Sequence, residues 1–397
     1  MPITLETLGV VCSLGADSTR VRDKLTAPDH KPVHLTCNSQ WHVEKHPMWV
    51  GEVTAPLPPM QAIPSCHQSR NNQLALAAYQ QISHSVDSWK AQHSSQRLGV
   101  IIGTSTSGIA SGESAVAHFL QQQHWPHGFH YSKQEMSAPA DFLAYLSDAK
   151  GPVYSVSTAC TSGAKALASA RALISAGIID AAICGGVDSL SGLPINGFSA
   201  LEAVSKGICR PFDAHRDGIN LGEGAALFFM TKNPQGIALS GVGESSDAYH
   251  ISSPHPEGAG AQAAMNSALR DADCRAKDIS YLNLHGTATV KNDEMESAAV
   301  ARVFSAGVPC SSTKHLTGHT LGAAGALEAA FCWLLMKSEQ QQVQLPRNHT
   351  RCGDPNLPAL DLVETQTVTQ PKYCMSNSFA FGGNNISLIL EHVYDSV

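Results

Sequence analysis

The chain alternates short, continuously apolar segments with helices of small residues, and it does so in both halves. In the first half the apolar segments lie at 98–103, 153–156, 181–185 and 225–230. In the second half they lie at 237–242, 279–284, 308–310 and 386–390. Strands of this kind are typical of sheets that helices cover on both faces. The pattern therefore predicts an α/β fold with an internal duplication.

A turn at 233–236 separates two strand-like runs, and we place the join of the two halves there. The expected units are residues 1–235, which would carry the nucleophile discussed below, and residues 236–397. Hydrophobic residues make up 43% of the 397 residues and charged residues 15%, which is ample for a large buried core. No Pro/Ser-rich linker or charge run divides the chain, so the join is expected to be a repeat boundary.

Composition excludes several classes of protein. The net charge of −7 argues against a general nucleic-acid binder, whose affinity would rest on a basic surface. The eleven cysteines are an odd count without CxxC pairing, which indicates free thiols in a reducing compartment. The N-terminus has no secretory signal pattern, and no apolar run reaches membrane-spanning length. We therefore expect a cytoplasmic protein without a membrane span.

Cys160 is the most informative single residue, because it lies where a β-branched strand gives way to a helix of small residues. The strand is expected at 153–156, and the helix runs from Ser162 towards Gly177. This position would put the sulfur at a helix N-terminus, where the dipole and the free backbone amides stabilise a thiolate. The alternative is a buried cysteine that packs as a small hydrophobic residue. The other segments of the chain distinguish a nucleophile from a packing residue.

Three further segments carry residues that suit a site around Cys160. His285 closes a strand-like run and precedes a turn of small and hydroxylated residues at 286–289. His319 lies in a loop that enters another helix of small residues, with Glu328 further along that helix. The last segment, 377–385, is read as a glycine-rich turn before the strand at 386–390.

These four segments, in this order, resemble the elongating β-ketoacyl-[acyl-carrier-protein] synthases of the thiolase superfamily. One Cys-x-x-Gly or His-Gly-Thr would be weak evidence, whereas the ordered set is specific. Shorter stretches extend the resemblance over nearly the whole chain, at 69–72, 210–213, 216–218, 222–224 and 245–250. The resemblance implies the thiolase fold, in which two similar halves, each a mixed sheet with helices, stack into five αβαβα layers.

The resemblance also implies catalytic roles. Cys160 would accept the acyl chain from the phosphopantetheine thiol of a carrier protein. Neutral His285 and His319 would donate ring N–H groups to the enolate oxygen that forms when the malonyl group loses carbon dioxide. Lys314 would favour the neutral histidines and add positive potential. The backbone amides of Cys160 and Phe381 would hold the oxyanion of the condensation step.

Supporting roles follow from the same resemblance. Glu328 matches a buried glutamate that pairs with the lysine or organises water or a cation. Thr287 and Thr289 match positions that hydrogen-bond the pantetheine arm. Phe379 is expected to pack in the core, with a role beside the substrate as the alternative, and Phe381 is expected to be a gate residue.

Departures from the family pattern concern the substrate more than the chemistry. Thr106 belongs to a hydroxyl-rich stretch, 104–107, where fatty-acid enzymes tend to have glycine and a bulky aliphatic residue near the acyl pocket. The stretch 290–293 replaces a usual proline after Thr289, and 231–236 is shorter than in the family. These features make a specialised ketosynthase of an aryl-polyene or other type II polyketide pathway an option beside fatty acid synthesis.

Nineteen histidines raise a metal hypothesis. His124, His127 and His130 lie close in sequence, but aromatic residues, proline and glycine interleave them, and no partner cysteines are near. We interpret them as a solvated loop and expect no metal. No cofactor is expected either, because the substrates arrive on the phosphopantetheine of the acyl carrier protein.

The function expected from the sequence is therefore a 3-oxoacyl-[acyl-carrier-protein] synthase. One alternative is a non-catalytic chain-length-factor subunit, although such partners typically lose the nucleophile. A thiolase-type acyltransferase is another, although Cys374 does not lie in the Cys-x-Gly context that its second cysteine needs. Expected partners are the acyl carrier protein, with Arg70 and Lys206 in its docking patch, and a second ketosynthase-like subunit in a homodimer or heterodimer.

Overall fold

Ten strands form one hydrogen-bonded sheet, which divides between β9 (Gly236–Ser246) and β1 (Ile3–Val11) into two five-stranded parts with the same strand order, called the first and second sheet below. The computed structural model describes residues 1–27 and 34–394. The first sheet has the order β5 (Val153–Val156), β4 (Leu98–Gly103), β6 (Ala181–Asp188), β8 (Gly224–Lys232) and β1. The second has the order β11 (Cys310–Ser311), β10 (Tyr281–Asn283), β14 (Tyr373–Phe379), β15 (Asn384–Val393) and β9.

The two sheets correspond strand by strand. In each, the three strands farthest from the join pair in parallel and the remaining pairs are antiparallel. A single register pair, Thr4 with Ala238, connects β1 to β9, so the two sheets meet edge to edge at one point. The expected duplicated α/β architecture with two mixed sheets is confirmed.

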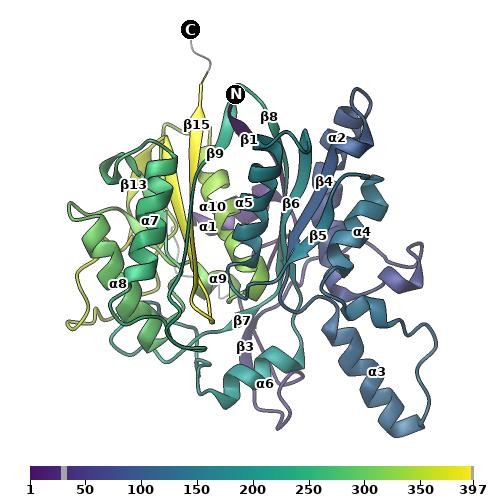
Figure 1. Ribbon diagram of the computed structural model, residues 1–397. Coiled ribbons are helices and arrows are strands. Elements are labelled where there is room, and N and C mark those ends of the chain that lie inside the picture. The colour runs from purple at the N-terminus through teal and green to yellow at the C-terminus, as the bar shows by residue number, and fades with distance from the viewer. Residues whose placement is uncertain (28–33, 395–397) are drawn as a thin grey trace.

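Helices form three layers around the two sheets (Figure 1). The middle layer, between the sheets, holds α1 (Ser18–Leu25), α5 (Ser162–Ser175) and α10 (Ala324–Met336). The outer layers hold α2 (Arg70–Lys90) and α4 (Ala138–Ser147) on one side and α7 (Ala259–Asp271) and α8 (Val290–Val303) on the other. Within the described ranges, no helix is both long enough and apolar enough to cross a membrane.

Smaller elements lie at the end of the molecule where the loops of both sheets gather. They are α3 (Ile109–Gln122), α6 (Gly192–Ala200), α9 (Lys314–Thr317), and the short strands β2 (Thr36–Asn38), β3 (Met48–Gly51) and β7 (Leu221–Gly222). A separate two-stranded sheet pairs β12 (Gln342–Gln344) with β13 (Thr367–Thr369). Figure 1 shows α3 extending away from the layers and α6 lying below the middle layer.

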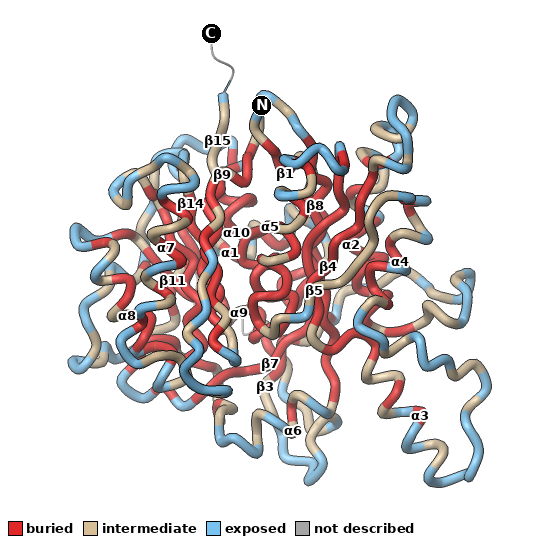
Figure 2. The backbone as a smooth tube through the Cα atoms, viewed as in Figure 1, coloured by how far each residue is buried: buried red, intermediate tan, exposed pale blue. Residues whose placement is uncertain are grey.

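Small residues let α5 and α10 pack closely in the middle layer, and every residue of α10 is buried (Figure 2). A Cβ atom on Gly163 would lie 2.9 Å from the Cβ of Ala326, and one on Gly325 would lie 2.8 Å from the Cβ of Ala164. Contacts this short leave no room for larger side chains, so these two glycines set the separation of the two helices.

One sequence expectation needs correction. The segment 377–385 is not a turn throughout, because Asn377, Ser378 and Phe379 belong to β14 and Asn385 to β15. The polar residues pair inside the sheet, where the Ser387 hydroxyl donates to Asn377 Oδ1 at 2.7 Å. Such internal pairing satisfies buried polar groups without a turn, and the turn itself is confined to residues 380–383.

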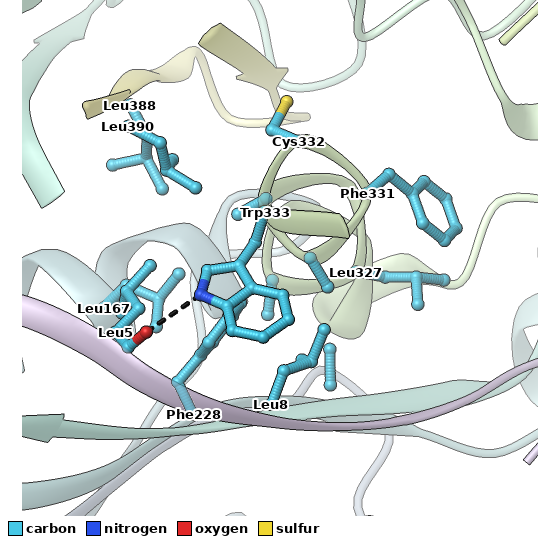
Figure 3. Close-up of a cluster of buried hydrophobic side chains, with 14 of the residues drawn as sticks. Leu5, Leu8, Leu167, Phe228, Leu327, Phe331, Cys332, Trp333, Leu388 and Leu390 are labelled. Carbon is cyan, nitrogen blue, oxygen red and sulfur yellow. Dashed lines mark hydrogen bonds between the residues drawn. The ribbon is translucent and has the colours of Figure 1, made fainter. Parts of the chain in front are cut away.

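Trp333 ties the middle layer to the first sheet. The register between β1 and β8 shifts between Leu5 and Thr7, and at this shift Trp333 Nε1 donates to the Leu5 carbonyl at 2.8 Å. Figure 3 shows the indole among apolar side chains that include Leu167 of α5 and Phe228 of β8. The hydrogen bond is buried, so its loss leaves a carbonyl without its partner in the core.

We predict that Trp333→Phe lowers the free energy of unfolding by about 1–3 kcal/mol through the lost hydrogen bond, with a further loss from the smaller ring. Urea unfolding followed by circular dichroism measures the change. Trp125→Phe is the matched control, because Trp125 is exposed and stacks on Phe119 and Phe129, and its effect should stay within about 0.5 kcal/mol. Equal effects of the two variants would contradict the role given to Trp333.

Candidate active site

Cys160 lies at the sharp connection between β5 and α5. Ala159, immediately before it, has a left-handed backbone with φ of 53°, and α5 begins at Ser162. Thr158 N donates to the Ser162 hydroxyl at 2.9 Å, which closes the turn. The sequence-based placement of the sulfur at the start of a helix is therefore correct.

The thiol itself is almost fully buried, with 7% of the residue exposed. Burial raises the pKa of Cys160 to about 12, and the nearby Lys314 ammonium opposes this effect only in part. The helix start is thus not enough to produce a thiolate at neutral pH, because desolvation outweighs it. The resting group is a neutral thiol that needs a proton acceptor.

His319 supplies that acceptor. Its Nε2 atom lies 2.9 Å from Cys160 Sγ. The ring of His285 meets the ring of His319 edge to face, with centroids 5.4 Å apart. Burial, reinforced by the Lys314 ammonium, holds the pKa of both histidines well below the usual value. Both rings are therefore neutral at physiological pH, and each can offer one N–H donor and one acceptor nitrogen.

Lys314 and Glu328 form a buried ion pair beside the two rings. The Lys314 ammonium also donates to the carbonyl oxygen of His285, so one cation holds both the carboxylate and a backbone group of the site. Burial raises the pKa of Glu328 to about 7 against the opposing effect of Lys314. The second oxygen, Glu328 Oε2, has no hydrogen-bond partner among the described residues. The pairing expected from the sequence is present.

Two buried carboxylates that sequence reasoning missed hold the turn after His285. Glu296 accepts the backbone N–H groups of His285 at 2.8 Å and Gly286 at 2.7 Å. Asp293 accepts the N–H of Ala288 at 3.2 Å. Burial raises the pKa of Glu296 to about 7 and that of Asp293 to about 6. The sequence offered one signal for them, since Asp293 and Glu296 lie three residues apart just after the His-Gly-Thr turn.

A cavity of about 510 Å³ leads from Cys160, His285 and His319 to the surface. Its wall includes Thr287, Thr289 and Phe379, which were expected beside the substrate, and the expected gate residue Phe381. The hydroxyls of Thr287 and Thr289 lie 2.8 Å apart. Phe379 is buried, and its ring centroid lies 6.0 Å from that of His285 in an edge-to-face arrangement. It therefore packs in the core and also lines the cavity. Phe381 is 39% exposed and lies 5.6 Å from the ring of Phe198.

Three expected residues lie elsewhere. Thr106 is not in the wall of this cavity, because its hydroxyl donates to Asp188 at 2.8 Å. Arg70 pairs with the buried carboxylate of Glu223, and a third of its own side chain is exposed. Lys206 is exposed, and its backbone N–H donates to Asp217, a residue of the cavity wall.

Two groups of side chains could each offer three ligands to a metal ion. Cys160, His285 and His319 bring their ligand atoms within 4.8 Å of one another, and so do His42, Glu44 and His46 in an exposed loop. The first group lies beside the Lys314 ammonium, whose charge opposes a bound cation. The three closely spaced histidines, 124, 127 and 130, lie on exposed or half-buried backbone after α3, in line with a loop.

We predict that both catalytic-site histidines remain neutral at pH 6. Because the folded pKa lies below the unfolded value of about 6.5, the unfolded chain binds more protons as the pH falls, and these histidines then reduce the stability of the fold. NMR of the protein with ¹⁵N-labelled histidine measures the two rings, identified by their loss in His285→Ala and His319→Ala. In Lys314→Met/Glu328→Gln both pKa values should rise yet stay below 6.5. A wild-type titration of either ring at 6.5 or above would contradict the assignment.

Comparison with known families and structures agrees with this geometry. The model of the β-ketoacyl synthase N-terminal domain matches residues 48–235, and that of the C-terminal domain matches residues 237–347. The 3-oxoacyl-[acyl-carrier-protein] synthase 2 of Staphylococcus aureus strain COL is 34% identical over 321 residues, 76% of each chain. Nodulation protein E of Rhizobium leguminosarum bv. trifolii is 39% identical over 271 residues, 65% of this chain and 66% of its own.

Solved structures extend the match to nearly the full length. A chain from the complex of a ketosynthase with its chain length factor from Xenorhabdus doucetiae is 46% identical, covers 98% of both chains and superposes with a TM-score of 0.93. A β-ketoacyl synthase from Burkholderia phymatum is 28% identical, with a TM-score of 0.87 over 99% of this chain and 100% of its own. The fold is thus the thiolase fold expected from the sequence, and the chain belongs to the β-ketoacyl synthase family.

Proposed function

We propose that this protein is a 3-oxoacyl-[acyl-carrier-protein] synthase that carries out a decarboxylative condensation on Cys160. The observation that carries the proposal is the contact of 2.9 Å between Cys160 Sγ and His319 Nε2, at the inner end of a cavity that also contains His285. A non-catalytic subunit would not need this set. A thiolase would need a second cysteine there, and among the described residues Cys160 is the one cysteine in the cavity wall.

The first half-reaction transfers an acyl chain to the enzyme. Cys160 Sγ attacks the carbonyl carbon of an acyl thioester on the carrier protein's phosphopantetheine, and His319 takes up the thiol proton as the sulfur attacks. The tetrahedral oxyanion is held by the backbone amides of Cys160 and Phe381, and its collapse breaks the carbon–sulfur bond to the carrier. The carrier thiolate leaves with the proton, so His319 returns to its neutral form.

The second half-reaction forms the carbon–carbon bond. A malonyl thioester loses carbon dioxide, and the electron pair of the broken bond becomes an enolate whose oxygen carries negative charge. Neutral His285 and His319, the latter now in the tautomer with its proton on Nε2, donate N–H groups to that oxygen, and such hydrogen bonds stabilise the charge more in a buried site than in water. The enolate carbon then attacks the acyl-Cys160 carbonyl, and Cys160 leaves as a thiolate that takes a proton from solvent.

The substrate pathway we propose is that of a specialised type II polyketide ketosynthase acting with a chain-length-factor-like partner. Support comes from the 46% identity over 98% of the chain to a protein solved in a complex of that kind, and the departure at 290–293, which lies partly in the cavity wall, agrees with it. The acyl carrier protein delivers both substrates, at the cavity mouth near Lys206.

We predict that the purified protein gains the mass of an acyl group when it is incubated with acyl carrier proteins that carry different primers, alone or with the co-expressed partner. Cys160→Ala should abolish the adduct, because no other residue in the cavity is a nucleophile of equal strength. Intact-mass spectrometry makes the measurement, and Cys352→Ala, which removes an exposed thiol, is the matched control. Absence of an adduct with every primer and with the partner present would overturn the proposal.

We predict that His285→Ala separates the two half-reactions. The hydrogen bond to the sulfur comes from His319 and not from His285, so acylation of Cys160 should proceed within about tenfold of the wild-type rate, whereas release of carbon dioxide from malonyl carrier protein should fall by about 10²–10³-fold through the lost donor. Release of ¹⁴C-labelled carbon dioxide and the acyl adduct are followed in parallel. Equal loss in both assays would instead assign His285 a general structural role.

A further inference from the structure

The carboxylate of Asp188 accepts hydrogen bonds from six groups, and the proposed mechanism gives Asp188 no role. It ends β6 and is fully buried. Its oxygens accept the hydroxyls of Thr104 at 2.6 Å, Ser105 at 2.6 Å and Thr106 at 2.8 Å. They also accept the backbone N–H groups of Ser105 at 3.0 Å, Thr106 at 2.9 Å and Gly322 at 2.6 Å.

This arrangement fits an anion. Three of its partners are backbone N–H groups, which can only donate, and the three hydroxyls are placed to donate as well. No ion pair of the described residues includes Asp188, so neutral donors alone compensate the buried charge. A buried carboxylate without such donors would be strongly destabilising, which means that the hydroxyl-rich stretch 104–106 is matched to this one group.

The donors come from the two turns that flank the reactive pair. The stretch 104–106 follows β4, whose last residue, Gly103, lies so close to α5 that a Cβ atom would be 2.3 Å from Gly163 N. Gly163 lies in the first turn of α5, the helix that begins just after Cys160. Gly322 follows His319 by three residues. One carboxylate therefore joins the loop packed under Cys160 to the turn that carries His319.

That turn is strained. Leu321 has a left-handed backbone with φ of 50°, which a leucine adopts only when its surroundings impose it. On the upstream side, His319 N donates to Asn220 O at 2.6 Å, and Gly222 N donates to His319 O at 2.9 Å. On the downstream side, Gly322 N donates to Asp188 at 2.6 Å and to the Ser105 hydroxyl at 2.9 Å, and that hydroxyl itself donates to Asp188. We expect that loss of the Asp188 carboxylate weakens both contacts and lets Leu321 relax towards the right-handed region, which would turn His319 away.

We propose that Asp188 is a positioning residue that holds His319 within hydrogen-bond distance of Cys160, through Gly322 and the strained Leu321. It touches neither substrate nor sulfur. Its charge has a second, separable effect, since the Asp188 anion is one of the groups that raise the pKa of Cys160. The consequence for turnover rests on the proposed function, whereas the consequence for the thiol does not.

The experiment compares Asp188→Asn with wild type in two assays. In the first, the free enzyme is alkylated with iodoacetamide across a pH range, and the Cys160 peptide is quantified by mass spectrometry. The alkylation profile should move to lower pH, because an anion that opposes the thiolate is gone. In the second, kcat for acyl transfer from the carrier protein should fall about tenfold or more, with KM within about twofold, since His319 is displaced and binding is not.

Two further variants separate position from charge. Gly322→Ala places a Cβ 2.7 Å from Asp188 Oδ2 and so separates Gly322 from Asp188 while the Asp188 charge stays in place. We expect kcat to fall without a shift of the alkylation profile to lower pH. Thr106→Val removes one donor and should give a smaller loss in the same direction. Both remain informative if Asp188→Asn does not fold. Asp180→Asn, at the surface before the same strand and paired with Arg97, is the control.

Wild-type alkylation and wild-type kcat in folded Asp188→Asn, or in Gly322→Ala, would overturn the proposal. A shifted alkylation profile with unchanged kcat would reduce Asp188 to an electrostatic neighbour of the thiol and would also overturn it. Because alkylation needs no carrier protein, a failure of the proposed condensation would appear as loss of turnover in the wild type and could not be mistaken for a failure of Asp188.

Discussion

The site depends on the close packing of α5 against α10 between the two sheets. Each helix begins at the reactive centre, so the separation of their axes sets the distance from Cys160 to His319. Gly163 and Gly325 make that separation short, because each leaves no room for a Cβ atom against the facing helix. Since α5 comes from one half of the duplicated chain and α10 from the other, the reactive pair exists only when both halves have folded and met.

Desolvation then decides the charge state of the centre. Burial keeps the Cys160 thiol and both imidazoles neutral and raises the pKa of Glu328 to about 7. Lys314 is the fixed cation beside them. A centre whose thiol and imidazoles are uncharged at rest, beside one fixed cation, is suited to a reaction whose negative charge appears only as bonds change.

Backbone strain accompanies each reactive residue. Ala159 precedes Cys160, Ala288 follows His285, and Leu321 follows His319, and all three have left-handed φ angles of 50–62°. Such conformations cost free energy and persist only where neighbouring contacts enforce them. Asp293 and Glu296 hold the turn after His285 by accepting backbone N–H groups. Asp188 likewise holds the turn after His319 by accepting the backbone N–H group of Gly322.

The sequence by itself determined the duplicated α/β architecture and predicted that Cys160, His285, His319 and Lys314 lie in one site, because apolar periodicity and turn chemistry are local and the ordered motifs are specific. Tertiary structure decided what depends on contacts between distant segments. Burial made Cys160 a neutral thiol despite its helix start, Asp188 drew the Thr106 hydroxyl away from the cavity, and Glu223 took the charge of Arg70. Desolvation and pairing are properties of the packed fold, and no local pattern in the chain encodes them.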